Sequence, residues 1–84
     1  MAYSLLLKPK VSKTLDNLDD STRARIRLVL DSIAQDPFSG KKLEGELKGK
    51  YSVRAWPYRI IYQVYKKELL ILVVDLGHRQ GIYK

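Results

Sequence analysis

The spacing of hydrophobic residues changes about half-way along this chain. In the first half, apolar residues recur every three or four positions and predict two amphipathic helices. The residues on these two stripes are Val11, Leu15 and Leu18, followed by Ile26, Leu30, Ile33 and Ala34. In the second half, apolar and polar residues alternate, which is the period of a half-buried strand. The pattern therefore predicts helices first and a sheet afterwards.

Proline and short polar residues mark the ends of the predicted helices. Pro9 suits the first position of the first helix, where its missing N–H is not needed. Asp19, Asp20 or Ser21 can cap the second helix. Pro37 ends that helix, because the residue before a proline avoids the helical conformation.

The remaining apolar stretches predict strands. Residues 3–7 form an edge strand, and residues 51–56 and 58–65 form a hairpin. Residues 69–76 are almost wholly apolar, as in a central strand covered on both faces. Residues 38–50 are rich in glycine and lysine and predict a mobile basic loop. The expected architecture is α+β: two N-terminal helices on one face of a twisted, mainly antiparallel sheet, in the order β-α-α-β-β-β.

The hairpin has a predicted register. If Trp56 and Pro57 form a two-residue turn, Arg54 lies directly opposite Arg59. Both arginines then project from one face, while residues 58, 60, 62 and 64 point toward the helices. Two like charges placed opposite each other reduce stability unless an anion joins them. This register therefore predicts an anion site.

Positive charge is concentrated in the second half. The net charge is +7; residues 1–40 hold six Lys or Arg against five Asp, whereas residues 41–84 hold ten against four Asp or Glu. Arg23, Arg25 and Arg27 lie mostly off the apolar stripe and predict a solvated helix face. A localised excess argues for an anionic partner. Nucleic acid is the commonest one, while an acidic protein or a general gain in solubility are the alternatives.

Length and composition exclude several classes. A chain of 84 residues fits one domain, residues 1–84. It has no cysteine and one histidine, so a disulfide framework is excluded and no metal or other cofactor is expected. No apolar run approaches the roughly 18 residues of a membrane span, and the N-terminal apolar stretch is too short for a signal peptide. We expect a cytoplasmic protein that does not bind membranes.

Several residues of the second half suit chemistry on an RNA phosphate. Attack by a 2′-hydroxyl on the adjacent phosphorus needs proton transfer and neutralisation of the extra negative charge, but no metal. Arginine neutralises phosphate oxygens, histidine transfers protons near neutral pH, and tyrosine stacks on bases or donates a proton. The candidate catalytic residues are Arg54, Arg59, His78, Arg79 and Tyr83.

Four of these five candidates also have a purely structural interpretation. Arg59 fits a solvated sheet surface, and His78 fits an ordinary loop. Arg79 can pair with Asp75 or with the C-terminal carboxylate. Tyr83 can be a terminal aromatic that packs on the core.

Further residues predict RNA contacts outside the catalytic group. Lysines of the basic loop can hold backbone phosphates, and a tryptophan at the hairpin turn can stack on a base. These residues are Lys41, Lys42, Lys48, Lys50 and Trp56. The alternatives are solvated lysines and a packing tryptophan.

Three segments together resemble a known superfamily. They are Tyr51-Ser52-Val53-Arg54, the run Tyr58-Arg59-Ile60-Ile61-Tyr62-Gln63-Val64, and the ending Gly77-His78-Arg79 with Ile82-Tyr83. In this order and spacing, over nearly the whole chain, the sequence resembles the RelE/ParE superfamily of bacterial and archaeal toxins.

The resemblance implies a RelE-like fold and a function. RelE-like toxins are ribosome-dependent endoribonucleases that cut mRNA in the ribosomal A site without a metal, leave a 2′,3′-cyclic phosphate and so inhibit translation. A cognate antitoxin wraps the toxin and keeps it inactive. The family's phosphate-binding arginine falls on Arg59, its second arginine on Arg79 and its C-terminal tyrosine on Tyr83. Its basic residue in the strand before the hairpin falls on Arg54.

One departure concerns proton transfer. Ribonucleolytic relatives often have a lysine where this chain has Ser52. Arg54 is a poor base because it does not deprotonate in proteins. His78, a nearby lysine, Glu44 or Glu46 would have to activate the 2′-hydroxyl instead.

Two other functions remain open. ParE-like toxins of the same fold inhibit DNA gyrase and do not cut RNA, and an RNA-binding relative with weak catalysis is the third possibility. Because the ParE-like branch generally lacks the full arginine and tyrosine set, Arg59, Arg79 and Tyr83 favour the ribonuclease.

Overall fold

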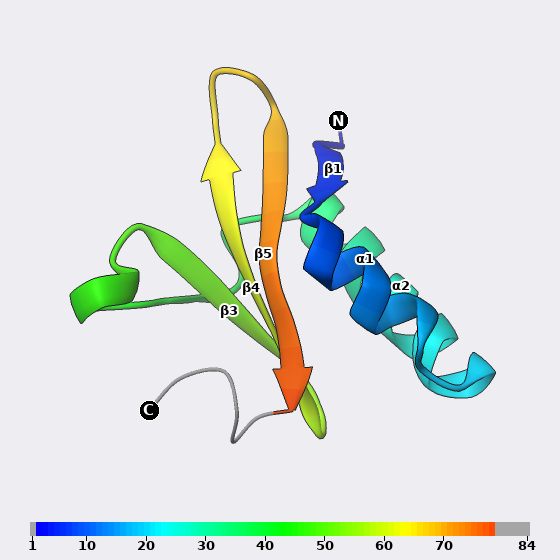
Figure 1. Cartoon of the computed structure of the whole chain (residues 1–84). Coiled ribbons are helices and arrows are strands. Elements are labelled where there is room, and N and C mark those ends of the chain that lie inside the picture. The colour runs from blue at the N-terminus through cyan, green and yellow to red at the C-terminus, as the bar shows by residue number, and fades with distance from the viewer. Residues whose placement is uncertain (1, 79–84) are drawn as a thin grey trace.

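The computed structural model describes residues 2–78, which form a five-stranded sheet with two helices on one face (Figure 1). The elements are β1 (Ser4–Leu7), α1 (Pro9–Asp16), α2 (Asp20–Gln35), β2 (Lys41–Lys42), a 3₁₀ turn (Gly45–Leu47), β3 (Lys50–Ala55), β4 (Tyr58–Tyr65) and β5 (Leu70–His78). The strand order is β1-β5-β4-β3-β2, and β1 runs parallel to β5 while the other neighbours are antiparallel. The α+β architecture predicted from the sequence is confirmed.

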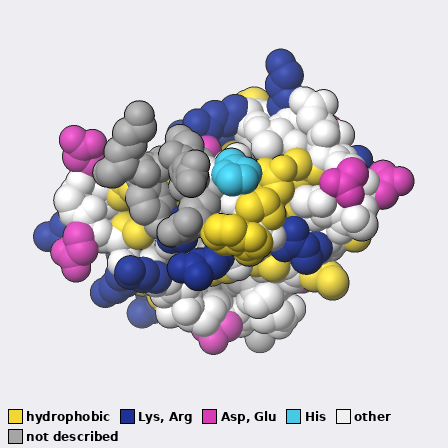
Figure 2. Space-filling view, turned by 90° about the horizontal axis from the view of Figure 1, so that it is seen from below, with side chains coloured by type: hydrophobic (Ala, Val, Ile, Leu, Met, Phe, Trp, Pro, Cys, Tyr) yellow, Lys and Arg dark blue, Asp and Glu magenta, His cyan; other side chains and the backbone are white. Residues whose placement is uncertain are grey.

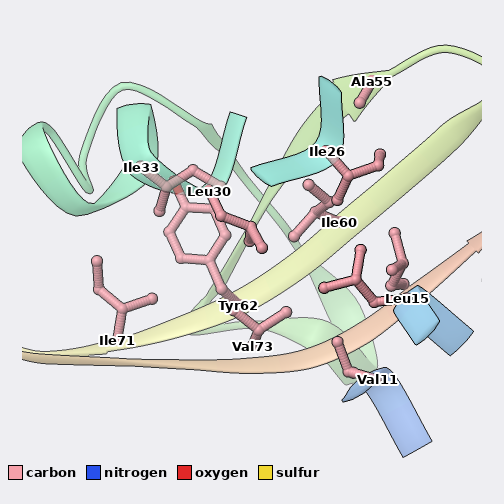
Figure 3. Packing of buried hydrophobic residues seen from close by; sticks show 11 residues of the cluster. Val11, Leu15, Ile26, Leu30, Ile33, Ala55, Ile60, Tyr62, Ile71 and Val73 are labelled. Atoms are coloured by element: carbon pink, nitrogen blue, oxygen red, sulfur yellow. The ribbon is translucent and has the colours of Figure 1, made fainter. Parts of the chain in front are cut away.

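The core lies between the helices and one face of the sheet (Figure 3). Tyr62 and Ile60 of β4 are fully buried and point toward α2, where Ile26 and Ile33 meet them. From α1, Val11 packs against the same cluster. The helical stripes and the strand alternation thus bury the residues that the pattern selects.

β5 is central, but the helices cover one of its faces only. Ile71 and Val73 are fully buried in the helix-side cluster, whereas Leu70 and Leu72 alternate with them and are half-buried. The expectation of complete cover on both faces therefore does not hold within residues 2–78. The pairing of β4 with β5 is also irregular, with a register shift between Ile61 and Tyr62 that alternation alone does not predict.

The second helix begins at a well-formed cap. The Asp19 carboxylate accepts hydrogen bonds from the Thr22 backbone N–H at 3.2 Å and from the Ser21 hydroxyl at 2.8 Å. These bonds from Thr22 and Ser21 stabilise the charged form and lower the pKa of Asp19 to about 2. Of the three predicted caps, Asp19 is the one used.

The prediction that Arg23 is solvated is wrong, because its side chain is half-buried and bonded to other groups. Its guanidinium donates to the backbone carbonyl oxygens of Leu18 at 2.6 Å and Leu15 at 3.3 Å. It also pairs with Asp20 at 3.0 Å. These carbonyls stand at and beyond the end of α1, where helices leave acceptors unpaired, so Arg23 fixes the turn between the helices.

The segment expected to be a mobile loop is partly joined to the sheet. Lys41 and Lys42 form β2 and pair with Ser52 and Tyr51 of β3. Gly40, just before β2, lies so close to the sheet that an added Cβ would stand 3.0 Å from the Ser52 carbonyl oxygen and would also meet the Tyr62 hydroxyl. Only a glycine fits there without rearrangement, and this close approach brings β2 to the edge of the sheet.

Candidate active site and basic surface

The β3–β4 hairpin brings two of the predicted arginines together. Arg54 of β3 lies directly opposite Arg59 of β4, and Ala55 pairs with Tyr58, which confirms the predicted register. Because Ile60 and Tyr62 face the helices, Arg54 and Arg59 project from the opposite, helix-free face. We call this the open face.

The surroundings of Arg59 suit an anion. Its partner on the β5 side is Gly77, so no side chain stands beside the guanidinium from that strand. The Arg59 side chain is half-buried and its Nε is shielded from solvent, while Arg54 is exposed. Shielding strengthens the attraction of a guanidinium for a phosphate, because less water competes for it.

On the open face, the residue pair next to the two arginines is buried. Ser52 is paired with Ile61, and the two side chains are 4% and 2% exposed. Ile61 lies outside the helix-side cluster, as expected for a residue on the other face. The position at which relatives often carry a lysine is therefore a buried serine here, beside the arginine pair.

His78 stands at the same end of the sheet but not on the same face. It pairs with Tyr58 of β4, and the two rings meet edge-on with centroids 6.0 Å apart. Tyr58 alternates with Arg59, so His78 lies on the helix side of the sheet end and is exposed there. The structure thus brings Arg54 and Arg59 together and sets His78 one register position away. Arg79 and Tyr83 lie outside the described residues.

The predicted RNA-contacting residues lie in β2, in the segment before β3, at the start of β3 and at the hairpin turn. Lys41, Lys42 and Lys48 are exposed, and Lys50 is half-buried at the start of β3. Trp56 is 59% exposed at the tip of the hairpin. Figure 2 looks onto the end of the sheet and shows Lys and Arg side chains gathered beside hydrophobic ones.

A buried tyrosine supports this surface and was not identified from the sequence. The Tyr62 hydroxyl donates to the Pro37 carbonyl at 2.8 Å, and the Tyr62 ring stacks on Tyr51 with centroids 5.6 Å apart. Burial is the main reason that the pKa of Tyr62 rises to about 12. Together with Gly40, this contact fixes the chain before β2. The sequence feature that could have indicated this close approach is Gly40, which stands directly before Lys41 and Lys42.

Within residues 2–78, no three His, Asp or Glu side chains gather as metal ligands would. Over the same residues, neither helix is long and apolar enough to cross a membrane.

Comparisons with known proteins agree with this fold. The archaeal RelE–RelB complex of Pyrococcus horikoshii OT3 contains a chain with 30% identity and a TM-score of 0.79, and the match covers 99% of this chain and 100% of that one. In the toxin–antitoxin complex RelBE2 of Mycobacterium tuberculosis the identity is 22%, the TM-score is 0.83, and the match covers 94% of this chain and 100% of that one. The fold is that of the RelE-like toxins.

The sequence comparisons identify the family. The curated toxin RelG of Mycobacterium tuberculosis is 27% identical over 86 aligned residues, which cover 100% of this chain and 99% of RelG. The family described as "ParE toxin of type II toxin-antitoxin system, parDE" matches residues 5–83. The chain therefore belongs to the ParE toxin family, within the RelE/ParE superfamily of toxins of type II toxin–antitoxin systems.

Proposed function

We propose that this toxin is a ribosome-dependent endoribonuclease that cleaves mRNA and thereby inhibits translation. The observation that carries the proposal is the cross-strand pair of Arg54 and Arg59 on the open face. Two guanidinium groups on neighbouring strands can contact two oxygens of one phosphate, which suits the scissile phosphate of the proposed reaction. The curated relatives named toxin RelG and putative toxin RelE1 support the RelE-like toxin on which this proposal builds.

In the proposed reaction the 2′-oxygen of one nucleotide attacks the adjacent phosphorus. The bond to the 5′-oxygen of the next nucleotide breaks, and the products are a 2′,3′-cyclic phosphate and a 5′-hydroxyl end. Arg59 and Arg54 neutralise the negative charge that develops on the non-bridging oxygens. Arg79 and Tyr83 remain candidates for the same site, and we propose no metal and no cofactor for any of these steps.

Proton transfer is the step in which this chain differs from relatives with a lysine at the Ser52 position. Ser52 is buried and cannot replace an amine as a base. His78 stands at the same end of the sheet as Arg59 but on its helix side, and it remains a candidate for moving the proton together with a nearby lysine, Glu44 or Glu46. Alignment of the mRNA by the ribosome would supply the remaining acceleration through positioning.

We also propose a cognate antitoxin as the protein partner. The solved relatives include RelE–RelB complexes, and a chain with net charge +7 suits a partner segment of opposite charge. In this proposal the toxin acts on ribosomes in the cytoplasm. A thermal melt of the chain alone and with the antitoxin tests the partnership, and an unchanged melting temperature would count against it.

Primer extension on mRNA from cells expressing the chain tests the ribonuclease. We expect new 5′ ends inside translated codons, and 2′,3′-cyclic phosphates at the matching 3′ ends. Intact mRNA during growth arrest would contradict the proposal.

Inhibition of DNA gyrase is the second candidate function. The observation in its favour is that the matching family is named for the ParE toxin. A supercoiling assay with purified gyrase separates the two candidates, since a ribonuclease would leave the enzyme fully active.

A further inference from the structure

Three of the basic residues surround one cavity. The cavity has a volume of about 260 Å³ and lies between β2, the 3₁₀ turn and the first residues of β3. Lys42, Lys48 and Lys50 line it, although they come from separate parts of the segment. Leu43 and Tyr51 add apolar surface to the lining.

The charge of this lining selects an anion. Three lysines line the cavity, and Glu44 is the acidic residue among its lining residues. An anion that entered would meet at least two cations without a matching acid, and two of the lysines are exposed enough to turn toward it.

The size and the apolar lining narrow the ligand further. Pockets for drug-sized molecules usually measure about 300–1,000 Å³, so this cavity suits a smaller group. Leu43 and the half-buried Tyr51, whose ring also stacks on Tyr62, offer apolar surface at the cavity, while the lysines offer charge to a phosphate. A single nucleotide combines these two properties.

The cavity lies at the sheet edge, where the row of residues that leads to the arginine pair begins. Lys42 pairs with Tyr51, and Tyr51 pairs with the helix-facing Tyr62, so Lys42 and Tyr51 lie on the helix side of this edge. Lys50 and Arg54 are four residues apart on β3, so both belong to the open face. At about 3.3 Å per residue the two positions are roughly 13 Å apart, a distance covered by no more than about four stacked nucleotides. Lys50 therefore borders the cavity and also begins the row that leads to the arginines.

We infer that this cavity is a subsite for one nucleotide of the single-stranded RNA substrate, separate from the scissile phosphate. The inference rests on the proposed ribonuclease function and adds a position at which the enzyme holds the strand. Lys42 and Lys48 bind phosphate oxygens, and the apolar lining receives the base.

The test measures binding of the full chain to fluorescent, uncleavable 2′-O-methyl RNA of increasing length, from about two to about eight nucleotides. For the unsubstituted chain, affinity rises stepwise once the strand reaches the cavity. The variant Lys42→Ala/Lys48→Ala loses that step and keeps its affinity for the shortest strands. Its salt slope falls by about 1.4, because each phosphate contact contributes about 0.7 for single strands.

A matched control removes the same amount of charge elsewhere. Lys13→Ala/Lys67→Ala also replaces two exposed lysines, but neither lines the cavity. In this control, the affinity still rises stepwise once the strand is longer than the first few nucleotides. For those strands, the salt slope of binding equals that of the unsubstituted chain. In a further series, one nucleotide of the strand lacks its base, and this abasic position is moved along the strand. At one position, the missing base weakens binding at least about fivefold, and it does so only in chains that keep Lys42 and Lys48.

The outcomes separate this subsite from the function on which it rests. If the lysine variant and the control bind all lengths equally, the subsite is wrong, even when primer extension shows mRNA cleavage. If the unsubstituted chain neither binds RNA nor cuts mRNA, the ribonuclease and the subsite both fail.

Discussion

The two faces of the β3–β4 hairpin use alternate residues of the same strands, yet they have opposite properties. On the helix side, Ile60 and Tyr62 are fully buried in the core. On the open face, Arg54 and Arg59 place two positive charges opposite each other. The difference shows that one hairpin supplies core residues through one face and a pair of arginines, our proposed anion site, through the other, because successive residues of a strand point to opposite sides.

The comparison also shows why the two faces tolerate different residues. A core position must fill its space, since a smaller side chain leaves a cavity. Arg54 on the open face is exposed and has no such requirement. Substitutions on the two faces should therefore separate folding from activity.

The largest expected effect is on the helix side. Ile60→Ala removes most of a fully buried side chain and should lower the free energy of unfolding by about 2–5 kcal/mol. Urea denaturation measures this change. Leu28→Ala is the control, because Leu28 is 69% exposed on α2 and its truncation should have almost no effect. Equal losses for the two variants would contradict the assignment of the core.

The second prediction concerns the open face. Arg59→Ala should reduce mRNA cleavage on ribosomes about 10²–10³-fold, since one preorganised group for the phosphate charge is lost. The free energy of unfolding should change by no more than about 1 kcal/mol, because a like-charge opposition disappears as well. Arg25→Ala, an exposed arginine on α2, is the control and should cleave normally. Parental activity in Arg59→Ala would remove Arg59 from the site.

A third, smaller effect is expected where the chain approaches the sheet before β2. Gly40→Ala forces a Cβ against the Ser52 carbonyl oxygen and the Tyr62 hydroxyl, which should cost about 1–3 kcal/mol. Tyr62→Phe removes one of these contacts, so Gly40→Ala should cost at least about 0.5 kcal/mol less in the Tyr62→Phe background. A double-mutant cycle from urea denaturation measures this coupling. Strict additivity would show that the hydroxyl does not limit the space.

The smallest expected effect is on the pH dependence of stability, and it concerns Asp19 at the start of α2, away from the hairpin. The pKa of Asp19 is about 2 in the folded chain, below its ordinary value of 3.8, so its cap stabilises the fold above pH 3.8. This contribution is lost as the pH falls through 3.8 toward 2. Asp19→Asn can still cap the helix but does not titrate, so its melting temperature should fall less than that of the parent over this range. Parallel losses would exclude a role for the carboxylate.

Much of the hairpin could be predicted from the sequence. The break at Pro57 and the alternation on either side set the pairing of Arg54 with Arg59, because both signals are local. The role of Arg23 could not be predicted in this way. Its partners are carbonyl oxygens at the end of another helix, and such acceptors have no signature in the sequence.

The candidate site also has features that the sequence predicts and features that only the structure shows. Residue types and spacing selected Arg54, Arg59 and His78, but only the register of β4 with β5 set His78 beside Tyr58, across the sheet from the arginines. The grouping of Lys42, Lys48 and Lys50 around one cavity also depended on how the 3₁₀ turn returns to β3. The sequence shows the positive charge of these lysines, but it does not show that they line the same cavity.

The sequence by itself determined the two helices, the four longer strands, the arginine pair and the resemblance to a toxin family, because these follow from periodicity, turn residues and short motifs. It did not predict β2, which lies in the segment expected to be a loop. Only the tertiary structure decided which face each candidate occupies beyond the hairpin, how closely Gly40 approaches the sheet and where a cavity forms. These features depend on contacts between segments far apart in the chain, such as Tyr62 with Pro37, and no local pattern specifies such contacts.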